Sequence, residues 1–285
     1  MRKQILSLLF LFSALISASS YGQNNPEDVI MKSESLGGSV YMLTGMGGNI
    51  GVSAGDDGLL IIDDQYEPMA EKISVALDAI LKDKLRYVIN THYHGDHTGF
   101  NAYMKEVKDA TIFAHDNVRI RLLSKEQHKH SELPVVTYSQ GVTFHFNGDT
   151  LKVVHLAHAH TDGDSAVMFE SANVLHTGDL FFNGLFPYID IDGGGSVKGY
   201  IAGVEKLIGM IDDDTKIIPG HGQLGNKAQL QEFVDMIKQT SAQVKQLKIN
   251  GMPVEDIIDS GLDEKWKGWS WAFINEEKWI RTLYR

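Results

Sequence analysis

Short apolar runs alternate with glycine-rich turns along most of the chain. Such runs cover positions 40–43, 49–54 and 59–62, and the turn Gly55-Asp56-Asp57-Gly58 joins the last two. An Asp-Gly pair between two apolar runs is a strong hairpin signal. Further short runs at 85–89, 110–114, 151–156, 166–169, 174–175 and 216–218 have the length and composition of strands. The pattern predicts a series of short strands spread over the chain.

Between these runs the spacing of the apolar residues changes. Steps of three and four residues, which mark an amphipathic helix, separate Ile73, Ala76, Leu77, Ile80 and Leu81. Residues 196–211 and 228–249 predict two more helices, the second of them long. Strands and helices interleave without a repeat, a low-complexity block or a clear linker. This order favours one α/β domain.

The N-terminal end has the pattern of a secretory signal peptide. Arg2 and Lys3 precede an apolar run at 5–16, and a small-residue stretch ends near Gly22. The run of 12 residues is shorter than the roughly 20 that span a bilayer as a helix. We expect residues 1–22 to be removed, leaving a domain at 23–285 in the periplasm or outside the cell, without stable membrane insertion. An uncleaved membrane anchor is the alternative.

The charge of the chain is acidic, with a net value of −11 at pH 7. Without Arg2 and Lys3, 24 basic and 37 acidic residues give −13. Such a protein repels nucleic-acid phosphates, so we expect no nucleic-acid partner. The chain contains no cysteine, which removes every thiolate from the possible metal ligands and nucleophiles.

The clearest chemical motif is His92-Tyr93-His94-Gly95-Asp96-His97, which follows the predicted strand 85–89. It places four potential metal ligands within six residues. Imidazole suits zinc and also iron, nickel and copper, while a carboxylate extends the range towards manganese. A solvated loop of histidines is the alternative interpretation. The spacing favours a metal site.

Three more turns after predicted strands carry residues of the same types. They are His160-Thr161-Asp162-Gly163-Asp164, Thr177-Gly178-Asp179 and Gly220-His221-Gly222. Functional loops gather at the strand ends along one edge of a sheet. His158 competes with His160, which the Thr-x-Gly-Asp context favours. The combined set is large enough for two metal ions with positions left for water: His92, His94, Asp96, His97, His160, Asp179 and His221.

In this order the motifs resemble the metal-ligand series of the metallo-β-lactamase superfamily, over nearly the whole chain after the leader. The resemblance implies an αββα sandwich, in which two mixed β-sheets pack face to face with helices on the outer faces. It also implies a dinuclear site. By the same resemblance, His92, His94 and His160 hold the first metal, Asp96, His97 and His221 hold the second, and Asp179 bridges them.

The bridging position distinguishes branches of this superfamily. Asp179 and the lack of cysteine resemble the branch of glyoxalase II and lactonases rather than lactamases with a cysteine ligand. The resemblance implies two Zn²⁺ ions, with iron or manganese possible, and a hydroxide that attacks ester, lactone, thioester or amide carbonyls of small molecules. By the same resemblance, Asp96 is the expected catalytic residue, which accepts a proton from the nucleophile. The alternatives are a mononuclear-iron oxidoreductase similar to sulfur dioxygenases, and a β-lactamase proper.

Several residues have weaker assignments. Asp63, at the end of the run 59–62, is expected either to orient a ligand histidine or to cap a turn. The loop 46–49, Phe181, Phe182, Phe186 and Tyr188 could wall a pocket, although core packing is the better reading for Phe181 and Phe182. The aromatic tail, with Trp266, Trp269, Trp271, Phe273 and Trp279, is expected to dock on the sheet rather than to bind a ligand.

Overall fold

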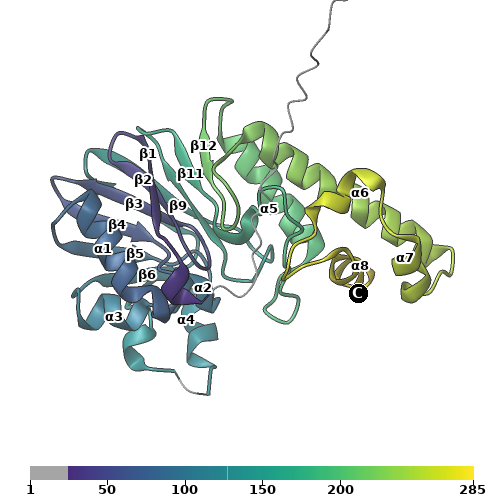
Figure 1. Cartoon of the computed structure of the whole chain (residues 1–285), viewed down its shortest axis with the longest axis horizontal. Coiled ribbons are helices and arrows are strands. Elements are labelled where there is room, and N and C mark those ends of the chain that lie inside the picture. The colour runs from purple at the N-terminus through teal and green to yellow at the C-terminus, as the bar shows by residue number, and fades with distance from the viewer. Residues whose placement is uncertain (1–24, 127) are drawn as a thin grey trace, which may run out of the picture.

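Two mixed β-sheets lie face to face, with helices on their outer faces (Figure 1). The computed structural model describes residues 25–126 and 128–285. The predicted αββα sandwich is confirmed. The predicted signal peptide, residues 1–22, lies outside the described residues.

The first sheet has seven strands in the order of the sequence. Strands β1 to β4 pair antiparallel, whereas β4 to β7 pair parallel through helical crossovers. The strands are β1 (Lys32–Gly37), β2 (Val40–Thr44), β3 (Ile50–Gly55), β4 (Gly58–Ile62), β5 (Leu85–Ile89), β6 (Thr111–His115) and β7 (Val136–Tyr138).

The second sheet has six strands in the order β13-β12-β11-β10-β9-β8. Only β11 and β12 pair parallel; the other neighbours are antiparallel. The strands are β8 (Gly141–Phe146), β9 (Asp149–His155), β10 (Ser165–Phe169), β11 (Val174–His176), β12 (Lys216–Ile218) and β13 (Gly225–Asn226).

The helices divide between the two outer faces (Figure 1). Beside the first sheet lie α1 (Ala70–Ile80), α3 (Asn101–Glu106) and α4 (Asp116–Leu123), and the short α2 (Gly95–Thr98) follows β5. Beside the second lie α5 (Val197–Met210) and α6 (Lys227–Ile249), and α7 (Val254–Ser260) and α8 (Glu276–Tyr284) pack against α6 and against each other. The predicted helices correspond to α1, α5 and α6 to within a few residues. Among the described residues, no helix has the length and apolarity needed to cross a membrane.

Strand β4 shows why the sandwich forms. All five of its residues are buried, which is expected when both faces of a sheet are covered. Leu60 and Ile62 point into the apolar layer between the sheets, whereas Leu59 and Ile61 pack with α1 and α3. Because successive side chains of a strand point to opposite faces, this one apolar run contributes to two separate cores.

A third core joins the second sheet to the C-terminal helices. Phe233 and Ile237 of α6 pack with Leu175 of β11, and Trp279 of α8 lies in the same cluster. The indole of Trp279 is fully buried and donates a hydrogen bond to Thr240 Oγ1 at 3.0 Å. The C-terminal helices are therefore part of the fold, and they place the segment between α7 and α8 near the end of the second sheet.

Candidate metal centre

The four predicted ligand turns meet at one edge of the sandwich. Backbone hydrogen bonds tie them together: Ser165 N donates to Thr91 O at 2.8 Å, and Gly220 N donates to Gly178 O at 2.8 Å. Asn49 N also donates to Gly220 O at 2.8 Å, which anchors the loop before β3 at the same edge. Residues that are far apart in the sequence therefore become neighbours.

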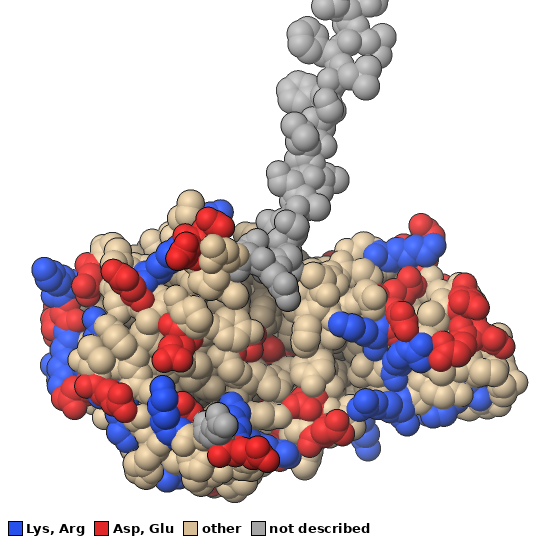
Figure 2. Space-filling view, turned by 60° about the horizontal axis from the view of Figure 1, so that its bottom comes forward, with Lys and Arg blue, Asp and Glu red and all other residues tan. Residues whose placement is uncertain are grey.

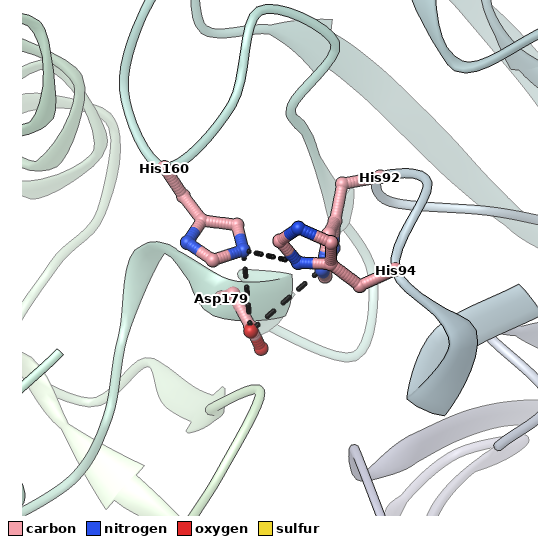
Figure 3. A group of neighbouring side chains, drawn as sticks. All are labelled: His92, His94, His160 and Asp179. Atoms are coloured by element: carbon pink, nitrogen blue, oxygen red, sulfur yellow. Dashed lines mark hydrogen bonds and ion pairs between the residues drawn. The ribbon is translucent and has the colours of Figure 1, made fainter. Parts of the chain in front are cut away.

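The first group of ligand-type side chains contains His92, His94, His160 and Asp179 (Figure 3). One ligand atom from each lies within 4.8 Å of the others. His160 Nε2 is 2.9 Å from His94 Nδ1 and 3.4 Å from Asp179 Oδ2, while His92 Nε2 is 3.7 Å from the same carboxylate oxygen. Three imidazoles and one carboxylate thus converge on one point.

The second group contains Asp96, His97 and His221. His221 Nε2 is 3.2 Å from Asp96 Oδ2, and His97 Nε2 is 3.6 Å from it. The other carboxylate oxygen of Asp179, Oδ1, lies 3.0 Å from His97 Nε2 and 3.4 Å from His221 Nε2. Asp179 therefore presents one oxygen to each group.

The outer ring nitrogens of the histidines are held by hydrogen bonds from behind. Asp63 accepts from His97 Nδ1 at 2.7 Å and from Thr91 N and Thr91 Oγ1, each at 2.7 Å. Thr91 Oγ1 in turn lies 3.0 Å from His92 Nδ1. Asp63 and His97 are fully buried. The structure thus gives Asp63 the orienting position, one of the two roles expected for it.

The remaining two histidines of the first group are held in the same way. His160 Nδ1 bonds to Tyr188 O at 2.7 Å, and His94 Nε2 lies 3.0 Å from Asp190 Oδ2. A protonated outer nitrogen leaves the inner nitrogen with a free lone pair, which is the arrangement found in metal-binding histidines.

Buried atoms without hydrogen bonds test whether metal ions fit here. Among the described residues, His92 Nε2, His97 Nε2 and Asp179 Oδ1 are buried and lack a hydrogen-bond partner. Leaving a buried polar atom unpaired costs roughly 1–3 kcal/mol, so three at one point need an explanation. All three face the interior of the two groups. Metal ions would satisfy them, and the residues fit such ions.

The pKa values of the histidines differ between the two ligand groups. Burial disfavours the charged forms and lowers the pKa of His160 to about 4 and that of His92 well below its usual range. In the second group burial also opposes protonation, but Asp179 and Asp96 outweigh it and raise the pKa of His221 to about 9. The carboxylates thus require positive charge beside them, as protons or as cations.

The backbone around the centre is strained and close-packed. Asp63 and Gln65 adopt left-handed conformations, with φ of 63° and 60°, which cluster at functional sites. A Cβ atom at Gly48 would overlap the His97 ring, and one at Gly220 would overlap the Asp179 carboxylate. Both positions therefore require glycine.

Residues 43–221 match the family model described as the metallo-beta-lactamase superfamily. This chain belongs to the metallo-β-lactamase superfamily. The predicted family is confirmed, and the superfamily consists mostly of metal-dependent hydrolases.

Three similar proteins illustrate the range of this superfamily. A metallo-beta-lactamase type 2 from Bacillus cereus is 21% identical over 64% of this chain and 69% of its own length. A hydroxyacylglutathione hydrolase from Polaromonas sp. is 26% identical over 56% of this chain and 57% of its own. The solved metallo-beta-lactamase from Pontibacter korlensis shares the fold with a TM-score of 0.63 and 17% identity, over 73% of this chain and 99% of its own.

A pocket of about 620 Å³ lies beside both groups of candidate metal ligands. Of the predicted wall residues, Phe182, Tyr188 and the loop residues Met46 and Gly47 line it. Phe181 packs instead against Phe233 in the core, with ring centroids 5.3 Å apart. The core interpretation is therefore right for Phe181 and incomplete for Phe182, whose buried ring stacks on His221.

The prediction for the aromatic tail is correct for some residues and wrong for others. Trp266 and Trp279 are buried in the C-terminal core, and α8 packs mainly on α6. Trp271 and Phe273 instead line the pocket. The error has a physical cause: aromatic spacing alone does not distinguish a ring that faces a core from one that faces a cavity.

Sequence reasoning missed Asp190 and Tyr93 as residues of the site. The Tyr93 hydroxyl donates a short hydrogen bond to Asp190 Oδ2, which also receives His94 Nε2. Although burial opposes ionisation, these hydrogen bonds hold the pKa of Asp190 well below its usual range. Asp190 lies 96 positions from His94, so only their approach in the fold reveals the contact.

Other histidines remain outside the two groups. His158 is exposed, and its Nδ1 bonds to Gly194 O at 3.0 Å. His176 is buried behind the centre, where Nε2 bonds to Asn49 O and Nδ1 accepts from Gly178 N. His115 stacks on His155 at 3.7 Å. The structure thus places His160, and not His158, beside the first group.

Proposed function

We propose that this chain is a metal-dependent hydrolase that binds two zinc-class ions and cleaves ester, lactone or thioester bonds in small molecules. The observation that carries the proposal is the position of Asp179, whose two oxygens face two different ligand groups. A carboxylate placed in this way would bridge two neighbouring ions.

The ligand assignment follows the geometry. His92, His94 and His160 would hold one ion, and Asp96, His97 and His221 the other, with Asp179 shared. When bound, such ions would lower the pKa of a water towards neutrality and polarise a carbonyl oxygen.

Asp96 has the properties of a proton acceptor. Its carboxylate lines the pocket, where a substrate would reach it. Although burial opposes ionisation, His97 and His221 lower the pKa of Asp96 to about 2, so it is deprotonated at neutral pH. A carboxylate in this state accepts a proton from the attacking water while it keeps its contact to His221. Asp96 is therefore the proposed catalytic residue.

One of the two alternative activities has support from a particular observation. The Bacillus cereus relative favours a β-lactamase as the second candidate. A mononuclear-iron oxidoreductase needs only one ligand set, and the complete group of Asp96, His97 and His221 is evidence against it. Elemental analysis tests the oxidoreductase, because a hydrolase of the proposed type holds two ions per chain, and the substrate panel tests the β-lactamase.

The main test combines metal analysis with kinetics. We expect about two zinc ions per purified chain, and turnover on a panel of lactones, esters, thioesters and β-lactams. An Asp96→Asn variant should lose about 10²–10⁴-fold in kcat/KM on every accepted substrate. Asp109→Asn, which changes an exposed carboxylate far from the pocket, serves as the control. Undiminished turnover by Asp96→Asn would contradict its role, and one iron per chain would contradict the dinuclear site.

The location and partners of the protein are also part of the proposal. The predicted signal peptide supports export to the periplasm or beyond, and cell fractionation tests this location. A small-molecule substrate fits a pocket of about 620 Å³. Figure 2 shows basic and acidic side chains interspersed over the hollowed face that it views, instead of one continuous basic patch. This distribution, with the net charge of −11, disfavours nucleic acid as a partner.

A further inference from the structure

The segment between α7 and α8 crosses the mouth of the metal centre, although it lies outside residues 43–221, which match the family model. Two of its side chains, Trp271 and Phe273, line the pocket together with His94 and His221. A segment outside the residues that match the family model thus forms one wall of the pocket.

The aromatic side chains of this wall form a continuous series of ring contacts. The Trp271 ring lies 5.7 Å from His221 and 5.6 Å from Phe273. Phe273 in turn lies 5.4 Å from Tyr188, whose ring is 5.7 Å from His94. The series begins at a ligand of the second group and ends at a ligand of the first. We call Trp271, Phe273 and Tyr188 the aromatic wall.

The wall is held in place before any substrate arrives. The Trp271 indole N–H donates to Phe186 O at 2.9 Å, and Trp271 N donates to Ile274 O at 3.0 Å. Phe186 N also donates to Trp269 O at 2.9 Å. Phe186 and Ile274 are buried, so these hydrogen bonds anchor Trp271 to fixed parts of the fold. Phe273 is 51% exposed and lines the pocket, so part of its ring presents apolar surface to a substrate.

Acidic groups line the pocket beside this wall, and a lysine lies at its outer end. Of the described residues, those that line the pocket include Asp96, Asp179 and Asp190 and no lysine or arginine. The Lys278 Nζ lies 5.4 Å from the centroid of the Phe273 ring and donates to Phe273 O at 2.6 Å. The apolar surface of the rings, rather than the charge around them, is therefore the feature of the wall that distinguishes substrates.

We infer that the aromatic wall selects substrates with a flat apolar group next to the scissile carbonyl, which packs on Trp271 and Phe273. The inference rests on the proposed hydrolase function and adds its specificity. Stacked and edge-to-face aromatic contacts, together with the apolar area that they bury, discriminate by about tenfold or more per ring. Trp271 and Phe273 are therefore specificity-determining residues.

A pair of acetate esters with similar leaving groups tests the inference on zinc-loaded protein. Ethyl acetate lacks the flat group, and benzyl acetate carries it. We expect kcat/KM for benzyl acetate to exceed that for ethyl acetate by about tenfold. Equal kcat/KM values for the two esters would overturn the inference.

Variants locate the preference in the wall. Trp271→Ala and Phe273→Ala should each remove most of the preference for benzyl acetate, measured as the ratio of kcat/KM for benzyl acetate to that for ethyl acetate. Trp269→Ala is the matched control, because Trp269 belongs to the same segment and stacks on Phe233 outside the pocket. If Trp269→Ala removes the preference equally, the effect comes from the segment as a whole and the inference is wrong.

A binding measurement separates this inference from the hydrolase proposal. Ligand-observed NMR with benzyl alcohol should give saturation transfer with the wild type and little with Trp271→Ala. If the wild type binds benzyl alcohol through Trp271 but hydrolyses no ester, the role of the aromatic wall is supported and the hydrolase proposal fails. If the wild type hydrolyses ethyl and benzyl acetate equally well and Trp271→Ala does the same, the hydrolase stands and the wall fails.

Discussion

Asp63→Asn is the substitution that best tests how the protein orients its candidate metal ligands. Asp63 is fully buried and accepts three hydrogen bonds of 2.7 Å, two from Thr91 and one from His97 Nδ1. Its φ of 63° lies in the left-handed region, which asparagine tolerates better than most residues. The substitution therefore changes the charge and one acceptor while it leaves the backbone in place.

The expected magnitude follows from these three contacts. A hydrogen bond to a charged group contributes about 1.5–3 kcal/mol and a neutral one about 0.5–1.5 kcal/mol, so three weakened bonds reduce the free energy of unfolding by about 2–4 kcal/mol. The new amide also presents N–H to His97 Nδ1, which then carries its proton on Nε2, the nitrogen that faces Asp179. We expect the zinc affinity of the second group to fall about 10–100-fold.

Two measurements separate orientation from stability. Competition with a chromophoric chelator gives the zinc affinity, and urea denaturation gives the free energy of unfolding. Asp149→Asn is the matched control, because Asp149 is a buried carboxylate that accepts from Thr150 N, Ser171 N and Ala172 N away from the centre. It should lose stability and keep its zinc affinity. Wild-type zinc affinity in Asp63→Asn would refute the orienting role.

Three further predictions concern the centre and the fold. Asp190→Asn removes the charged partner of His94 and should weaken zinc binding by about tenfold in the same competition assay; unchanged affinity would contradict this contact. Asn226→Ala removes the capping box of α6 and should cost about 1 kcal/mol in urea denaturation, and no loss would mean that the cap contributes nothing. In the metal-free protein, the pKa of His221 rises from 6.5 to about 9, so its contribution to stability is present below pH 6.5 and is lost as the pH rises to 9. The pKa of His160 falls to about 4, so stability is also lost as the pH falls from 6.5 to 4. Urea denaturation of the metal-free protein, kept so by a chelator, should therefore give the largest free energy of unfolding at pH 6.5 among pH 4, 6.5 and 9. A steady rise or fall of this free energy with pH would be inconsistent with the two pKa shifts.

Much of the fold could be predicted from local patterns. Strands β5 and β12 begin and end at the residues expected from their apolar runs, and α1, α5 and α6 agree to within a few residues. Strand β8 was not predicted, although Val142, Phe144 and Phe146 alternate with Thr143 and His145. Burial on both faces produces a continuous apolar run, whereas an edge strand with one buried face, such as β8, produces a short alternation that is easily overlooked.

The sequence by itself determined the ligand types of the candidate centre, because four of the seven side chains lie within one short loop and the others follow strand ends with a recognisable composition. The tertiary structure decided which oxygen of Asp179 faces which group, and that Asp63 lies behind His97. It also decided that Asp190 reaches His94 and that Trp271 and Phe273 turn towards the pocket while Trp266 and Trp279 turn into the core. The physical reason is that a loop motif is local, whereas the direction of a side chain at a cavity depends on packing between segments far apart in the chain.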